Sequence, residues 1–163
     1  MLKNILFEVR DYARAPASFA DRGKDALLTR ADAQALVPVV TGAVPLLVHV
    51  ERASDILVIL DLKRDVPALK LVLVGATEGW TVARQIAAAK VPVLASALAD
   101  LPASFEQLAA TQSNIGRLQA AGVIVGIGMI NDDETRQARL VKQYAGNLVA
   151  LGKLPGAAGL DWG

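Results

Sequence analysis

The chain has 163 residues, and 17 Lys and Arg residues against 16 Asp and Glu residues give a formal net charge of +1. Hydrophobic residues make up 53% and charged residues 20%, which excludes intrinsic disorder, because disorder requires low hydrophobicity and high net charge. The near-cancellation of charge argues against nucleic-acid binding through a strong basic field. The absence of cysteine excludes disulfide and zinc–thiolate sites, and the single histidine excludes a metal site built from histidines alone.

Neither a membrane span nor a signal peptide is predicted. The longest uncharged stretch, residues 33–49, is broken by Pro38 and Gly42, whereas a spanning helix needs roughly 20 apolar residues. Charges at residues 8–11 leave no room for the apolar core of a signal peptide. We therefore expect no membrane association and, by default, a cytoplasmic protein, with the location open if a segment precedes Met1.

The N-terminal part is predicted to be helical. Apolar residues recur at helical spacing over residues 2–14, which indicates an amphipathic helix, and a linker completes residues 1–28. Thr29 is placed to cap a second helix that starts near Arg30 and ends by Gly42.

A repeating pattern follows, in which short apolar runs alternate with helical segments. The runs cover residues 45–50, 69–74, 91–95 and 123–127, and the predicted helices cover 52–64, 78–90, a segment ending near Ala121, and 132–151. This alternation is typical of βαβ units in a parallel sheet. We expect one α/β domain over 1–163, with about four parallel strand–helix units in a core over 29–152 and a C-terminal tail over 153–163.

Chemistry is expected at the carboxyl ends of the strands, where parallel α/β folds bind ligands. Ionisable residues follow these ends: His49, Glu51, Glu78, Asp132 and Asp133. Such groups could bind a divalent metal or perform acid–base catalysis, and we expect Glu51 and Glu78 to contact substrate. Alternatively, the acids only cap the helices that follow, and His49 is a structural histidine.

A dinucleotide site is not expected at Gly126-Ile-Gly128. The third glycine of the fingerprint falls at Asn131, and the acids that follow would repel a pyrophosphate.

Several segments resemble the amidohydrolase superfamily in its imidazolonepropionase-like branch. They are Pro45-Leu-Leu-Val-His-Val-Glu-Arg-Ala-Ser-Asp-Ile56, Leu71-Val-Leu-Val-Gly-Ala-Thr-Glu-Gly-Trp80, Val82-Ala83, Ala88-Ala-Lys-Val-Pro-Val93, and Arg139 through Leu148, with Ala145-Gly146-Asn147 near its end. The resemblance covers roughly residues 30–152. It implies a (β/α)₈ barrel, of which the four units look like strands five to eight. A complete barrel takes about 250 residues, and the first-strand metal histidines have no counterpart here.

The resemblance also implies roles for individual residues. His49 matches the fifth-strand metal histidine and would be a metal ligand, whereas the sixth-strand histidine falls at Gly75, which cannot ligate through a side chain. The last-strand catalytic aspartate matches Asp132 or Asp133, which would move protons; Glu134 is a further candidate.

The resulting hypothesis is a fragment or truncated member of a metal-dependent amidohydrolase family. The parent protein would hydrolyse C–N amide-type bonds of a small-molecule substrate with Zn²⁺ or another divalent metal. This chain would be inactive alone, and it would hold either such a metal or none. The alternative is a non-catalytic half-barrel that serves association, either with a second copy or with a complementary half-barrel, because unpaired strand edges and an uncovered apolar face invite binding. An open-sheet binder similar to a flavodoxin-like domain is a third interpretation.

Overall fold

The computed structural model describes residues 1–19, 26–97, 99–128 and 138–162. Two compact units are present: Met1–Leu46 with Leu62–Lys70, and Leu47–Asp61 with Leu71–Gly163. The expected single domain stays a prediction. Among the described residues, no helix is both long and apolar enough to cross a membrane.

Both predicted N-terminal helices are confirmed in the first unit. They are α1 (Leu2–Arg14) and α2 (Arg30–Val40). The helical spacing of α1 buries Leu6, Val9 and Tyr12, and the Tyr12 ring meets Phe19 edge to face at 5.2 Å between centroids. The helix therefore forms because its apolar stripe has a core to enter.

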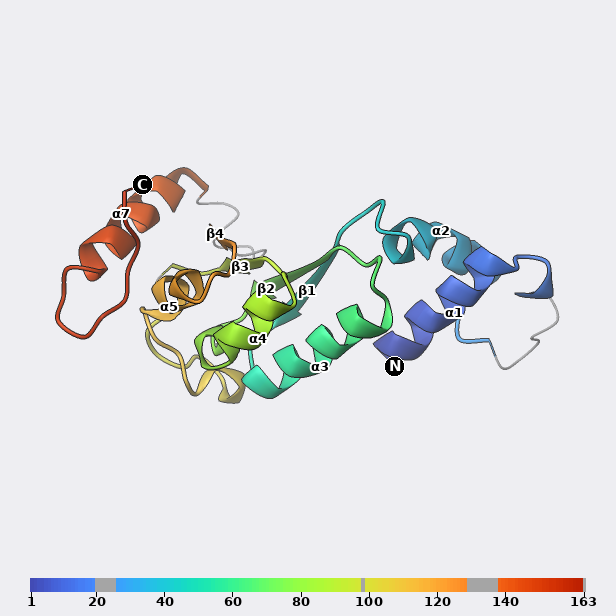
Figure 1. The fold of residues 1–163 in the computed structure, drawn as a ribbon, viewed down its shortest axis with the longest axis horizontal. Helices are drawn as coiled ribbons and strands as arrows, with labels where there is room; N and C mark the ends of the chain where they lie inside the picture. The colour runs from blue at the N-terminus through green and yellow to red at the C-terminus, as the bar shows by residue number, and fades with distance from the viewer. Residues whose placement is uncertain (20–25, 98, 129–137, 163) are drawn as a thin grey trace. The chain divides into compact units, whose positions relative to one another are not determined.

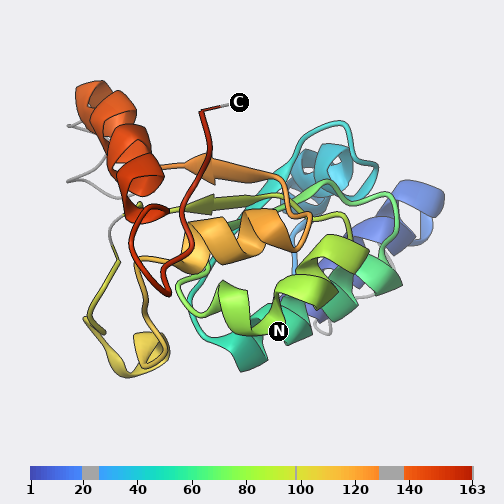
Figure 2. The same cartoon turned by 60° about the vertical axis from the view of Figure 1, so that its left-hand side comes forward.

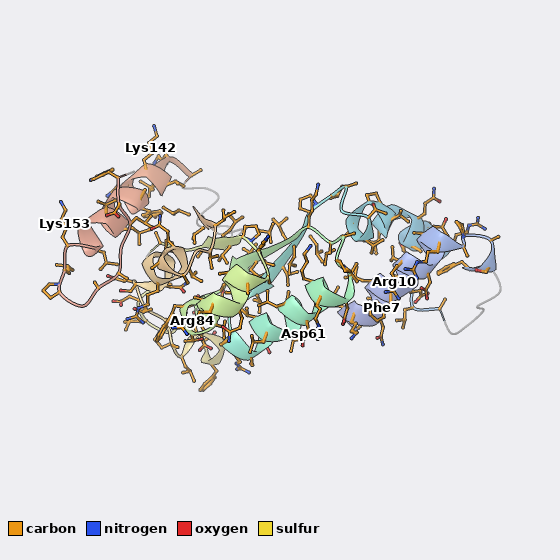
Figure 3. The ribbon with its side chains drawn as sticks, viewed as in Figure 1. Phe7, Arg10, Asp61, Arg84, Lys142 and Lys153 are labelled. Carbon is orange, nitrogen blue, oxygen red and sulfur yellow. The ribbon has the colours of Figure 1, made fainter. Side chains whose placement is uncertain are left out.

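Polar contacts fix the start of α2 and bond the segment before it to α1. The Thr29 Oγ1 accepts a hydrogen bond from the Asp32 N–H at 3.2 Å, which confirms the predicted cap of α2. Glu8, buried on α1, accepts the backbone N–H of Leu27 at 3.0 Å. On the same helix the Arg10 guanidinium lies 4.4 Å from the centre of the Phe7 ring, and Figure 3 labels both residues.

The second unit carries the sheet, whose order is β1-β2-β3-β4 (Figure 1). The strands are β1 (Leu46–Val50), β2 (Leu71–Gly75), β3 (Val93–Ala95) and β4 (Val125–Ile127). β2 pairs with β3, and β3 with β4, in parallel. β1 runs the same way, because Leu46 donates to the Lys70 carbonyl and Ala76 donates to the Val50 carbonyl. The predicted α/β fold with four parallel strands is confirmed.

Helices follow the strands, as predicted. They are α3 (Ala53–Asp65), α4 (Ala83–Ala88), α5 (Asn114–Ala120) and α7 (Val141–Leu151), with 3₁₀ turns at Gly79–Val82, Phe105–Gln107 and Ala138–Leu140. Figure 2 shows α4 and α5 on the same side of the strands. The helix expected over 78–90 begins as a 3₁₀ turn, and of the helix expected over 132–151 the structure describes only the part from residue 138 onward.

The two faces of the sheet differ in exposure. On one face Leu73, Val93 and Ala95 have no exposed surface. On the other face Val72 and Leu94 are half-buried, and in β1 the exposed positions are Leu47 and His49. Parallel sheets are normally covered on both faces. This sheet therefore has one helix-covered face and one face that the described residues cover only in part.

Candidate functional site

His49 and Glu51 lie together at the carboxyl end of β1. The His49 Nε2 is 2.8 Å from the Glu51 Oε1, because residues two apart on an extended segment point to the same side. The His49 side chain is 64% exposed and the Glu51 side chain only 10%. The structure thus brings together two of the predicted site residues, with the imidazole facing outward and the carboxylate inward.

The loop after β2 holds Val50 and Glu51 in place with three consecutive backbone amides. Thr77 N–H donates to the Glu51 Oε2 at 3.0 Å, Ala76 N–H donates to the Val50 carbonyl, and Glu78 N–H donates to the Glu51 carbonyl. Ala76 has a φ of +47°, a costly conformation for a residue with a side chain. The Thr77 amide and the His49 ring together give the Glu51 carboxylate one hydrogen-bond partner at each oxygen.

Gly75 leaves room for the Glu51 carboxylate. Its φ is +88°, and a Cβ at this position would lie 2.4 Å from the Glu51 Oε1. The sequence resemblance put a metal-ligating histidine at this position. Here the carboxylate of Glu51 takes up the space that any side chain at position 75 would need.

Glu78 is engaged by the backbone at both oxygens. Oε2 accepts from Ala53 N–H at 3.0 Å, at the start of α3, and Oε1 accepts from Ala109 N–H at 3.1 Å. The capping interpretation expected a bond to the helix that follows, whereas Glu78 makes no side-chain cap at Gly79–Val82 and instead bonds the start of the preceding helix α3. The expected contact of Glu78 with substrate stays a prediction.

Asn114 is a structural residue of this region that the sequence did not reveal. It is 3% exposed, its Nδ2 donates to the Ala76 carbonyl at 3.0 Å, and its Oδ1 accepts from Trp80 N–H at 3.0 Å. The Trp80 indole donates to the Ala109 carbonyl at 2.8 Å and carries the Arg117 guanidinium 4.3 Å from the ring centre. These contacts fix the loop that in turn grips Glu51.

A pocket of about 420 Å³ opens beside His49. Its lining consists of Val48, His49, Val50, Glu51, Asp55, Val58, Ile59 and Glu106. The Ser104 hydroxyl accepts a hydrogen bond from the Glu106 backbone N–H. Hydrogen bonding of the Glu106 carboxyl to Ser104 lowers the pKa of Glu106 below its usual range. The pocket combines an apolar wall with acids, of which Glu106 lies 3.7 Å from the Arg52 guanidinium and Glu51 is bonded by His49 and Thr77.

The remaining predicted site residues, Asp132 and Asp133, lie outside the described residues, as does Glu134. Within the described part of the chain, no three His, Cys, Asp or Glu side chains are grouped so that they could hold a metal ion. Both Glu51 oxygens are already engaged, so His49 and Glu51 alone do not fit the metal centre that the resemblance implies.

Comparisons with known proteins bear mainly on the fold. No family model matches the chain, and no curated protein matches it. Among solved structures, an amidohydrolase from Thermotoga maritima MSB8 is similar, with a TM-score of 0.64 and 22% sequence identity. The similarity covers 88% of this chain and 38% of that one. The chain therefore shares the fold of a part of that protein, well under half of its length.

Proposed function

We propose that this chain is part of an amidohydrolase-like hydrolase that acts on C–N amide-type bonds of small molecules, and that it is inactive on its own. The observation that carries the proposal is His49 at the carboxyl end of β1, with an exposed imidazole beside a pocket and a carboxylate fixed against it. The fold shared with an amidohydrolase supports it. In parallel α/β folds this edge of the sheet is where ligands bind.

The other part of the barrel would supply what the described residues lack. The described residues offer one imidazole and no complete ligand set for a divalent metal. Asp132 or Asp133 is proposed to move protons. Glu51 is proposed to act on the substrate indirectly, through its contact with the His49 ring. Metal-dependent hydrolysis and the imidazolonepropionase-like assignment are therefore proposals about the complete protein.

The proposal is tested with the purified chain, its His49→Ala variant, a panel of amides and lactams, and added Zn²⁺. We expect hydrolysis at the background rate in both proteins and well under one equivalent of zinc per chain by elemental mass spectrometry. We also expect lactams to shift the His49 imidazole signals in NMR spectra, because the substrate-facing side of the site is still present. Signals that no amide or lactam moves would contradict the proposal, and turnover that His49→Ala abolishes would disprove the claim of inactivity.

The sheet also favours a second candidate, a non-catalytic half-barrel that serves association. Leu47 on β1 is 43% exposed, and Val58 on α3 is 66% exposed, while Glu51 and Glu78 are occupied by internal hydrogen bonds. In this case Asp132→Asn and Asp133→Asn should change the free energy of unfolding by no more than a helix cap contributes, about 0.5–2 kcal/mol. A ligand lost in either variant would contradict this candidate.

A further inference from the structure

The sheet face that the helices leave uncovered is apolar from one edge to the other. Leu73 and Val125 both pair with Val93 on the helix-covered face, so the residues before and after each of them point to the uncovered face. The uncovered face is formed mainly by Leu47, Val72, Val74, Leu94 and Ile124, with His49 at its rim. Leu47 is 43% exposed and Ile124 is 77% exposed. Within the four strands this face carries no Lys, Arg, Asp or Glu, so it suits a partner that binds by apolar contact and not by ion pairs.

At one edge of the sheet, β1 has backbone groups that point away from its neighbour. The Val50 carbonyl accepts a hydrogen bond from the Ala76 N–H, directly after β2. Successive residues of a strand turn their N–H and C=O groups to opposite sides, so the backbone groups of Leu47 and His49 point away from β2. No strand among the described residues lies beyond β1. This edge is therefore a template for another strand.

At the other edge, β4 presents the matching template. The Ile124 carbonyl, at the start of β4, accepts a hydrogen bond from the Val93 N–H, so the backbone groups of Val125 and Ile127 point away from β3. The described part of the chain places no strand beyond β4. Because all four strands are parallel, the β4 edge of one copy can pair in parallel with the β1 edge of another copy.

The helix-covered sides of the two edges are complementary as well. Val58 on α3 is 66% exposed and lines the pocket beside β1 together with Val48. Beside β4 lies a hollow of about 400 Å³ with an apolar wall, to which Val125 and Ile127 of β4 and Val141 of α7 contribute. When β1 of one copy pairs with β4 of another, the exposed Val58 and this hollow come to the same side of the joint.

We propose that two copies of this chain pair through both edges, β1 of each copy with β4 of the other, so that eight parallel strands close around the apolar face. The inference rests on the association candidate of the proposed function and names its partner as a second copy. A second copy supplies both missing edges and a second apolar face at once, and its net charge of +1 causes little repulsion. Eight strands enclose an interior that side chains fill. Closure leaves no edge for a third copy.

The first experiment places opposite charges on the two edges and follows the mass by light scattering at micromolar concentration. Leu47→Lys alone and Ile124→Glu alone should each raise the dimer dissociation constant by about tenfold or more, because each puts an unpaired charge into both joints. In an equimolar mixture, the Lys of one copy meets the Glu of the other at one joint, and the second joint has the wild-type residues. We expect the mixture to recover the mass of two copies.

Leu154→Glu is the matched control, since it adds the same charge at a 57% exposed position outside both edges. Alone it should keep the wild-type mass, and mixed with Leu47→Lys it should restore less dimer than Ile124→Glu does. An Ile124→Glu protein that stays dimeric would indicate pairing of β1 with β1 and would overturn the proposal. So would a mixture that Ile124→Glu restores no better than Leu154→Glu.

Circular dichroism checks that each variant is folded. If a charged variant loses its helical signal, Leu47→Ser and Ile124→Ser take its place. Both serine variants should weaken the dimer, and an unchanged dimer in Ile124→Ser would again exclude β4 from the joint.

The second experiment measures the mass of the wild-type chain over a range of concentrations. We expect two copies and no further growth. A mass that keeps rising with concentration would show open pairing of edges and would disprove closure, while the association candidate itself would stand. A monomer at every concentration would disprove both. Neither experiment depends on metal or on amide hydrolysis, so their outcomes are distinct from failure of the hydrolase proposal.

Discussion

Gly75 and Gly122 offer a matched pair for separating backbone strain from steric exclusion. Their φ angles are +88° and +87°, but a Cβ at Gly75 would meet the Glu51 carboxylate, whereas a Cβ at Gly122 would meet nothing within 4 Å. Gly122→Ala should lower the free energy of unfolding by about 1–2 kcal/mol, the cost of a left-handed residue with a side chain. Gly75→Ala should lose about 1–3 kcal/mol more from overpacking.

Urea unfolding followed by circular dichroism measures both variants. The Gly75→Ala protein should also lose the His49–Glu51 contact, which is visible in the imidazole signals. Equal destabilisation of the two variants would show that the space at Gly75 is not filled by Glu51.

For individual residues, the sequence predicted contacts between residues close together in the chain and did not predict contacts between residues far apart in the chain. The contact between His49 and Glu51 follows from their separation of two residues on an extended segment. The Thr77 amide bonds Glu51 over 26 residues, and Asn114 reaches the Ala76 carbonyl over 38 residues. Local patterns carry no signal for such contacts, because they depend on how loops far apart in the chain meet after folding.

At the scale of elements, Gly116 shows how a contact can reverse a helix propensity. Ala normally stabilises a helix interior over Gly by about 0.8–1 kcal/mol. In α5, however, a Cβ at Gly116 would lie 2.4 Å from the Ala158 carbonyl oxygen of the C-terminal tail. Gly116→Ala should therefore lower the free energy of unfolding, by about 1–3 kcal/mol from overpacking less the propensity gain. Gly146→Ala in α7, where the nearest atom is 3.9 Å away, should instead raise it.

Thermal unfolding of Gly116→Ala and Gly146→Ala measures the change in stability of each variant. A Gly116→Ala protein that is more stable than the wild type would mean that the tail does not pack on α5. Two further hydrogen bonds anchor the same tail. Ala158 N–H donates to the Ser113 Oγ at 3.0 Å, and Leu160 N–H donates to the Leu148 carbonyl at 3.2 Å.

The end of α3 makes the stability of the first unit depend on pH. Lys3 on α1 lies 2.6 Å from Asp65, and its hydrogen bond lowers the pKa of Asp65 below the ordinary value of 3.8. A carboxyl whose pKa is lowered by folding stabilises the folded state above its unfolded-state pKa, and this contribution is lost as the pH falls through the folded-state pKa. Asp65→Asn should thus be less stable than the wild type at neutral pH, and the difference should shrink as the pH falls below 3.8.

Urea unfolding over a series of pH values measures this difference, and Lys3→Gln should reproduce it, because it removes the other half of the pair. A difference that stays constant down to strongly acidic pH would exclude the Lys3–Asp65 contact as its source. The effect should also diminish with added salt, since the pair is exposed to solvent.

The helices and strands themselves were largely predictable. Apolar runs separated by helical segments indicate a parallel sheet. Right-handed connections allow several strand orders, so the consecutive order β1-β2-β3-β4 was expected only from the resemblance to a barrel. The sequence overestimated the helix over 78–90, where Gly79–Val82 forms a 3₁₀ turn instead. There the backbone follows Asn114, which binds Trp80 N–H, a tertiary contact that overrides local propensity.

At the scale of the whole molecule, the partly uncovered face of the sheet predicts association. We expect the purified chain to be larger than a monomer by light scattering at micromolar concentration. Leu47→Lys, which places a charge on the 43% exposed position of β1, should shift it toward the monomer. Leu154→Lys, at a 57% exposed position after α7, is the control that should leave the size unchanged.

A monodisperse wild-type monomer that binds no apolar dye would exclude association through this face. If both lysine variants dissociate the assembly, the contact is a general apolar one and does not depend on β1. The mass of the assembly then distinguishes the two kinds of partner. If the purified chain alone forms an assembly with the mass of several copies, the partner is a second copy of this chain and not a complementary half-barrel.

The positions of the two tryptophans have a practical consequence. Trp80 and Trp162 both belong to the second unit, whereas the first unit contains Tyr12 and no tryptophan. Intrinsic tryptophan fluorescence therefore reports only on the sheet-bearing unit, whereas the helical signal in circular dichroism comes from the helices of both units. Recording both signals through one denaturation would show directly whether the two units unfold as a single cooperative body or one after the other.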